Sequence, residues 1–313
     1  NVYSSLKLFE IFFKVNSDEE VNQTGADFEV NLFKALLVLN SSFTKKQFKT
    51  FQSTQDLPIE LKFPMMLFCA SYPISDKINY NINVLWTSQF IKAMYLFQFL
   101  ERDPRTQQLL LNFLNRFECT NWKEYLIRLL PLTISVVDND KETHTDISIK
   151  PGENYFNDCR FLELLCINND DDIDESDFIA LRSKPFYKIG EGVYRVIFGL
   201  FVIEKIFKGI YFQLREINKL LPKKTRISNL KSLFGDEFSE KILSYTILQE
   251  IYPNNCIAIS GEELSTRKID GSPDYYIRKG KDILLFESKD FLIQASVKDT
   301  FDFSQYEIEF EKK

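Results

Sequence analysis

The chain has 313 residues, of which 44% are hydrophobic and 27% charged, an ordinary globular composition that argues against an intrinsically disordered protein. Its net charge of −6 argues against a protein that coats nucleic acid through general positive charge. The longest apolar stretch, 193–212, is interrupted by charged residues, so we predict no transmembrane segment and no membrane partner. One histidine and five scattered cysteines give little support to a zinc site or a Ser-His-Asp triad. Reduced thiols in a cytoplasmic protein are the expectation.

The N-terminal half of the chain has apolar residues at helical spacing, separated by short polar breaks. We interpret its Phe and Tyr side chains as the core of a helical bundle, in preference to a surface that stacks nucleic-acid bases. We therefore assign residues 1–150 to a helical domain. Binding of protein partners is its candidate role, because no catalytic motif occurs in it. Helices are predicted over residues 5–15, 27–39, 44–51, 64–70, 86–101, 106–117 and 121–130.

Residues 151–225 are predicted to connect the helical domain to the rest of the chain. Residues 137–154 are polar and include a Pro-Gly pair, so a loop or domain boundary is expected there. A helix is predicted over 155–167, a hairpin over 183–196 and one long amphipathic helix over 198–221.

The third region, residues 226–313, opens with a predicted helix over 234–252 that has an acidic first turn. Glu237 and Glu240 are three positions apart in it, so they are expected on one face. A strand over 256–260 and a polar loop over 261–271 follow.

The most informative stretch is a predicted β-hairpin that ends at Asp274 and Glu287. Two β-rich runs, Tyr-Tyr-Ile and Ile-Leu-Leu-Phe, flank a turn with Gly280, and glycine tolerates the positive φ of tight turns. Opposed residues of an antiparallel pair have a constant sum of positions. A turn centred between Gly280 and Lys281 therefore places Asp274 opposite Glu287, with Cβ atoms about 4.5–5.5 Å apart. Lys289 is two residues beyond Glu287 and points to the same face.

Two carboxylates at that distance repel each other, and a divalent cation with oxygen ligands would relieve the repulsion. A nearby ammonium group would orient and activate a water beside the cation. The same three side chains could instead form an ordinary cross-strand salt bridge on a surface hairpin. The residue types alone leave this alternative open.

Pro273-Asp274, a hairpin and then Glu287-Ser288-Lys289 resemble the signature of the restriction-endonuclease-like nuclease superfamily, Pro-Asp … (Asp/Glu)-x-Lys. The resemblance implies that Asp274 and Glu287 hold Mg²⁺, with Mn²⁺ as a substitute, and that the backbone carbonyl of Ser288 completes the site. It implies that Lys289 positions the attacking water. The implied reaction is cleavage of phosphodiester bonds, in DNA rather than RNA by the habit of the family.

In the same family, the helix before the first core strand often carries a third acidic residue. Glu240 is our first choice for that role, as a catalytic residue and metal ligand. If Glu240 faces the site, the apolar residues of the helix lie on its packing side. Glu237 is the second choice. A pair of acids that only stabilises the positive end of the helix dipole is the alternative.

The fold implied by the resemblance is a restriction-endonuclease-like αβββα core in an α+β or α/β protein, behind the N-terminal all-helical domain. The second arm of the hairpin is apolar on both faces, which predicts a sheet covered by helices on both sides. A strand over 291–297 and a helix over 302–313 are expected next. The family has a further core strand after that helix, so the core is predicted to be truncated at its C-terminus.

A metal-dependent endonuclease is therefore the first functional hypothesis. The alternative is a non-catalytic interaction or assembly protein with a degenerate nuclease fold, which the acidic balance and the missing strand favour. A Walker-type phosphate-handling enzyme has little support, because the chain has no Gly-rich phosphate loop. Cutting both strands of DNA would need two sites and hence a homodimer. By analogy alone, a helical domain joined to such a nuclease would suit a phage-defence system.

Overall fold

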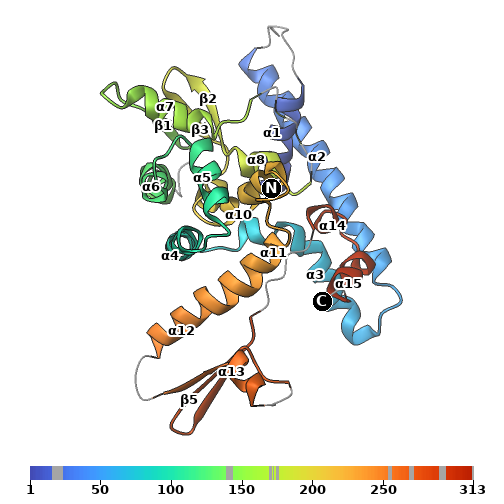
Figure 1. Cartoon of the computed structure of the whole chain (residues 1–313). Coiled ribbons are helices and arrows are strands. Elements are labelled where there is room, and N and C mark those ends of the chain that lie inside the picture. The colour runs from blue at the N-terminus through green and yellow to red at the C-terminus, as the bar shows by residue number, and fades with distance from the viewer. Residues whose placement is uncertain are drawn as a thin grey trace. The chain divides into compact units, whose positions relative to one another are not determined.

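The computed structural model describes residues 1–15, 24–138, 144–168, 171, 173, 176–252, 256–267, 271–288 and 294–311 (Figure 1). Helices predominate, and the described residues form two small three-stranded antiparallel sheets. This mixed composition confirms the coarse α+β prediction. The chain divides into two compact units, one of residues 1–87, 126–209 and 293–313, and one of residues 88–125 and 210–292. The predicted divisions after residues 150 and 225 stay a prediction.

Unit 1 contains most of the predicted N-terminal helices, several of them longer than expected. The predicted helices over 27–39 and 44–51 are one continuous helix, α2, whose N-cap Thr24 accepts the backbone N–H of Asp27. The predicted helix over 64–70 extends into α3, which includes two prolines. The helices of unit 1 are α1 (Val2–Lys14), α2 (Gly25–Ser53), α3 (Ile59–Ile78), most of α6 (Trp122–Asp138), α7 (Tyr155–Glu163), α8 (Ile179–Ser183), α9 (Gly199–Glu204), α14 (Ala295–Lys298) and α15 (Phe303–Glu311), together with the start of α4 (Ile82–Arg102).

A small sheet of order β1-β3-β2 completes unit 1, formed by β1 (Asp146–Ser148), β2 (Phe186–Gly190) and β3 (Val193–Val196). The predicted hairpin over 183–196 is confirmed as β2 and β3. The stretch 137–154, predicted as a loop or domain boundary, contains a short strand at residues 146–148. These residues pair with β3, and the Arg195 guanidinium donates to the Asp146 carboxylate at 2.6 Å across the pair.

The core of unit 1 draws on segments from both ends of the chain. Phe43 of α2 packs against Tyr3, with ring centroids 4.5 Å apart, and against Phe301, with centroids 5.5 Å apart. Phe301 is fully buried in the same cluster, although it lies more than 250 positions after Phe43. The C-terminal segment is therefore part of the core of this unit.

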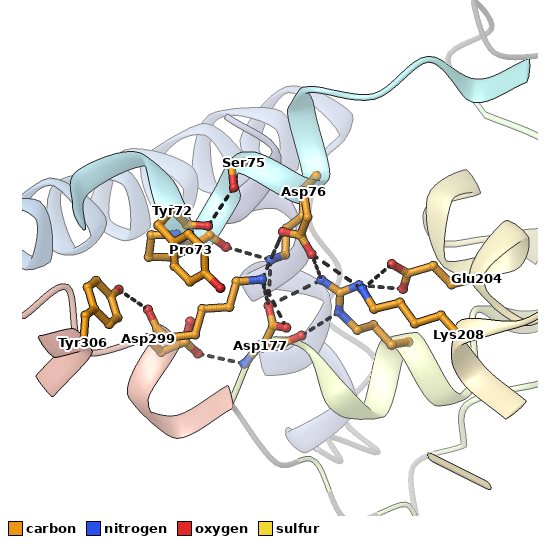
Figure 2. Close-up of polar contacts among 12 residues, drawn as sticks. Tyr72, Pro73, Ser75, Asp76, Asp177, Glu204, Lys208, Asp299 and Tyr306 are labelled. Atoms are coloured by element: carbon orange, nitrogen blue, oxygen red, sulfur yellow. Dashed lines mark hydrogen bonds and ion pairs between the residues drawn. The ribbon is translucent and has the colours of Figure 1, made fainter. Parts of the chain in front are cut away.

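Unit 1 also contains a buried ion cluster, which we define as Asp76, Lys77, Asp177, Arg182 and Lys298 (Figure 2). The Asp177 carboxylate accepts from Lys77 at 2.7 Å and from Lys298 at 3.3 Å. The Asp76 carboxylate accepts from Arg182 at 2.8 Å and from Lys298 at 3.1 Å. The cluster joins α3, the start of α8 and α14, three elements that are far apart in the sequence.

The carboxylates of the ion cluster are held in their charged form. Burial raises their pKa values, but Arg182 and the two lysines outweigh that effect and lower the pKa of both Asp76 and Asp177. The cluster therefore stabilises the fold of unit 1 only while both carboxylates are ionised.

Unit 2 has a helical part built around stacked aromatic rings. Phe97 lies parallel to Trp122, with centroids 5.6 Å apart, and Phe113 meets Tyr125 edge to face. The helices of this unit are the end of α4, α5 (Gln107–Arg116), α10 (Lys208–Leu220), α11 (Leu230–Ser232), the π-helix η1 (Leu233–Ser244), α12 (Tyr245–Ile251) and α13 (Gly261–Thr266). Its sheet has the order β4-β5-β6, with β4 (Ile257–Ser260), β5 (Tyr275–Lys279) and β6 (Asp282–Phe286).

Three sequence predictions for residues 198–297 are wrong. The single helix over 198–221 is broken between α9 and α10, where the buried ammonium of Lys205 donates to the carbonyl of Ser183. The polar loop over 261–271 contains the helix α13. The strand over 291–297 is helical from Ala295, and residues 289–293 lie outside the described residues.

The prediction that helices cover both faces of the second sheet is also wrong. Ile283 and Leu285 of β6 are 53% and 64% exposed, although they are apolar. Within the described ranges, no helix is both long enough and apolar enough to cross a membrane.

Candidate functional site

The hairpin of β5 and β6 has the register predicted from the sequence. Tyr275 pairs with Phe286 and Lys279 pairs with Asp282, so paired positions have the predicted constant sum. Gly280 in the turn has a φ of 62°, which a side chain at that position would disfavour. Asp274 and Glu287 are the next residues beyond the last strand pair, one on each arm. We call these two residues, together with Ser288, the hairpin end.

Asp274 is fixed by hydrogen bonds to its backbone and to its side chain. One carboxylate oxygen accepts the backbone N–H of Ser288 at 2.5 Å, which joins the two arms beyond the end of the strands. Its carbonyl accepts the backbone N–H of Gly261 at 2.6 Å. A Cβ atom on Gly261 would lie only 2.9 Å from the carbonyl oxygen of Pro273, so this close approach of two backbones requires glycine.

Glu240 lies on η1, which packs against β5 through a tyrosine. The hydroxyl of Tyr275 donates to the backbone carbonyl of Glu240, and the Tyr275 ring stacks on Tyr245 with centroids 5.5 Å apart. The structure therefore places the predicted acidic helix next to the first arm of the hairpin.

The charges of the candidate site interact with one another. Partial burial raises the pKa of Glu240, and the negative charges of Asp274, Asp236 and Glu287 raise it further, while Lys241 lowers it. Glu240 therefore experiences the charge of both hairpin-end carboxylates, and its ionised form is destabilised.

Glu237 has a different environment from Glu240. Its carboxylate accepts from the guanidinium of Arg105, which also binds Asp103. A carboxylate that is already paired with arginine is less suited to bind a cation. This difference favours Glu240 over Glu237 as the third acidic residue.

Two parts of the predicted site stay predictions. Lys289 lies outside the described residues, and the role of the Ser288 carbonyl as a metal ligand is not tested by its N–H bond to Asp274. Among the described residues, no group of three or more His, Cys, Asp or Glu side chains is arranged so that it could hold a metal ion. The hairpin end offers carboxylate and carbonyl oxygens, which suit a hard cation such as Mg²⁺.

Sequence reasoning missed two residues that support the site. Gly261 allows the close contact with Asp274, and Tyr275 holds η1 against the sheet. A glycine directly after a predicted strand is a recognisable signal of close backbone approach. Tyr275 carried no such signal, because a tyrosine in a strand is expected for many reasons.

Comparison of the chain with models of known protein families, with curated proteins and with solved structures gives no match.

Proposed function

We propose that the chain is a metal-dependent nuclease with a restriction-endonuclease-like core, and that DNA is its substrate. The observation that carries the proposal is the hairpin register, which brings Asp274 and Glu287 to the same end of adjacent strands. The raised pKa of Glu240, caused by burial and by neighbouring carboxylates, supports it further. An acidic site of this kind is stabilised by a bound cation, which offsets the repulsion between the carboxylates.

In the proposed mechanism, Asp274 and Glu287 would hold Mg²⁺, and the Ser288 carbonyl would complete the protein ligands. The cation, when bound, would neutralise charge on the scissile phosphate and lower the pKa of the attacking water. Lys289 would orient that water and stabilise negative charge in the transition state. Glu240 would bind a second ion or a water molecule beside the first, so the site would contribute three acids and one ammonium group.

The test is cleavage of supercoiled plasmid DNA at increasing Mg²⁺ or Mn²⁺ by the full chain and by two variants. Asp274→Ala and Lys289→Ala are each expected to reduce cleavage by more than about a hundredfold, because each removes a group that acts on the reacting phosphate. Asp282→Ala and Lys281→Ala are matched controls on the same hairpin and are expected to retain activity. Full activity in both Asp274→Ala and Lys289→Ala would refute the assignment.

A non-catalytic assembly protein with a degenerate nuclease fold is the second candidate. The exposed apolar residues Ile283 and Leu285 on an edge strand favour it, because such strands pair readily with another chain. Metal titration separates the two functions. A working site should bind Mg²⁺ and raise the melting temperature. At a Mg²⁺ concentration a hundred times the Kd, the free energy of unfolding should rise by about 2.7 kcal/mol. A melting temperature that does not respond to either cation would favour the second candidate.

A further inference from the structure

Helix α2 has two opposite faces with different environments. Its inner face packs in unit 1, where Phe43 and Thr50 are buried. Its outer face consists of residues at helical spacing, all of them exposed, and we call it the α2 basic face. The α2 basic face is formed by Lys34, Val38, Ser41, Lys45, Phe48, Lys49 and Gln52. At 100° per residue these seven positions are centred about half a turn away from the buried ones. Figure 1 shows α2 as one continuous helix, so they form a single stripe.

The charge of this segment is opposite to that of the whole chain. Residues 30–55 include four lysines and no aspartate or glutamate, whereas the complete chain has a net charge of −6. Lys34, Lys45 and Lys49 have no hydrogen-bond or ion-pair partner among the described residues. In contrast, Lys77 and Lys298 of the same unit are paired with carboxylates. Among the residues that the structure describes, the α2 basic face is therefore a local positive surface whose three lysines pair with no carboxylate.

An aromatic side chain lies among these lysines. Phe48 is 68% exposed, and it follows Lys45 by three positions and precedes Lys49 by one. A phenylalanine exposed to this extent contributes little to the core. Lysines next to an exposed aromatic ring are the arrangement by which proteins bind single-stranded nucleic acid, with charge on the phosphates and the ring stacked on a base.

We propose that the α2 basic face binds a nucleic-acid strand, with Lys34, Lys45 and Lys49 on its phosphates and Phe48 against an unpaired base. From Lys34 to Lys49 the helix rises about 22 Å, a length over which a polyanion presents many phosphates. The proposal rests on the proposed function only for the choice of nucleic acid as the polyanion. An acidic membrane surface shares the charge, and α2 also exposes Phe33, Leu37 and Phe51 on a face beside the lysines. Because a membrane-bound helix has such a separate apolar face, binding to anionic vesicles is the competing outcome that the experiment measures.

The experiment measures binding of the full chain to fluorescently labelled DNA by anisotropy, in EDTA, so that no metal-dependent cleavage can occur. A single strand and a duplex of the same sequence are compared over a series of salt concentrations. The triple variant Lys34→Ala, Lys45→Ala, Lys49→Ala removes the charges. The matched control Lys123→Ala, Lys150→Ala, Lys219→Ala changes the net charge equally at exposed lysines elsewhere.

The triple variant is expected to lower the slope of log Kd against log salt by about 2 to 3, from the loss of three phosphate contacts, while the control keeps the parent slope. Phe48→Ala is expected to weaken binding of the single strand about tenfold or more and that of the duplex much less. Equal loss in the triple variant and its control would overturn the proposal. Binding of the parent to vesicles of anionic lipid without binding to DNA would also overturn it.

The result is independent of the nuclease test. If Asp274→Ala binds DNA like the parent and the triple variant does not, the surface is confirmed whether or not the parent cleaves DNA. If the parent cleaves DNA and the triple variant binds and cleaves it equally well, the surface proposal fails and the nuclease proposal survives.

Discussion

Cations outweigh burial at both carboxylates of the ion cluster in unit 1, whereas burial and neighbouring acids outweigh the one lysine that acts on Glu240 in unit 2. Asp76 and Asp177 are each within 3.4 Å of basic side chains, and their pKa values are lowered. Beside the hairpin end, Glu240 has a raised pKa, from burial and from the charges of other acids. Carboxylates whose pKa is lowered by cations stabilise a fold in their ionised form, whereas a carboxylate with a raised pKa costs stability when it ionises.

The largest expected effect comes from breaking the ion cluster. Asp177→Asn leaves Lys77, whose side chain is only 1% exposed, without its closest carboxylate. Lys77 keeps only the more distant Asp76 carboxylate at 3.3 Å. We expect the free energy of unfolding to fall by about 3–5 kcal/mol, the usual cost of removing one partner of a buried ion pair. Chemical denaturation would measure it. Asp146→Asn, which breaks a more exposed pair with Arg195, is the control and should cost about 0–1 kcal/mol. Similar losses in both variants would contradict the structural role of the cluster.

A smaller effect is expected from acid. Because the pKa values of Asp76 and Asp177 are lower in the folded chain than the ordinary 3.8, their contribution to stability is complete above that value. It is lost as the pH falls through the folded-state pKa values. Denaturation followed from about pH 6 to about pH 2 should therefore show a loss of stability that is shallower in Asp177→Asn than in the parent. Parallel curves for the two proteins would argue that other groups dominate the acid response.

The smallest expected effect is a gain in stability when the charge of Glu240 is removed. The raised pKa of Glu240 means that its charge opposes folding at neutral pH, so Glu240→Gln should raise the melting temperature without added metal. The gain should be below about 1 kcal/mol, because the group is only partly buried and solvent screens it. Glu237→Gln on the same helix should give no gain, since that carboxylate is paired with Arg105. A loss of stability in Glu240→Gln would contradict the proposed repulsion.

The sequence predicted the local features of the candidate site, because they depend on short-range rules. The hairpin register follows from the position of Gly280 and the constant sum of paired positions, and the structure has that register. Helix α13 was missed although Ser260 and Glu263 have the spacing of a capping box, and the Ser260 hydroxyl does accept the Glu263 N–H.

The ion cluster could not be predicted in the same way. Lys77 and Asp177 are 100 positions apart, and Asp76 and Lys298 are 222 positions apart. Neither helical nor strand periodicity relates residues at such separations, so the pairing depends on how distant elements pack. The exposed face of β6 was mispredicted for a related reason. An apolar strand indicates that burial would be favourable, but it does not identify a segment that covers the strand.

The position of Lys298 and Phe301 has a consequence for dividing the gene into expression fragments. Both residues follow the candidate catalytic motif in the sequence, yet they pack with α2, α3 and α8, whose residues come much earlier. A fragment that starts near residue 226 would separate them from those partners and would also deprive the N-terminal helices of their closing contacts. A chain truncated just after the hairpin would keep the candidate motif, but it would lose Lys298 and Phe301 and so disturb the core of unit 1.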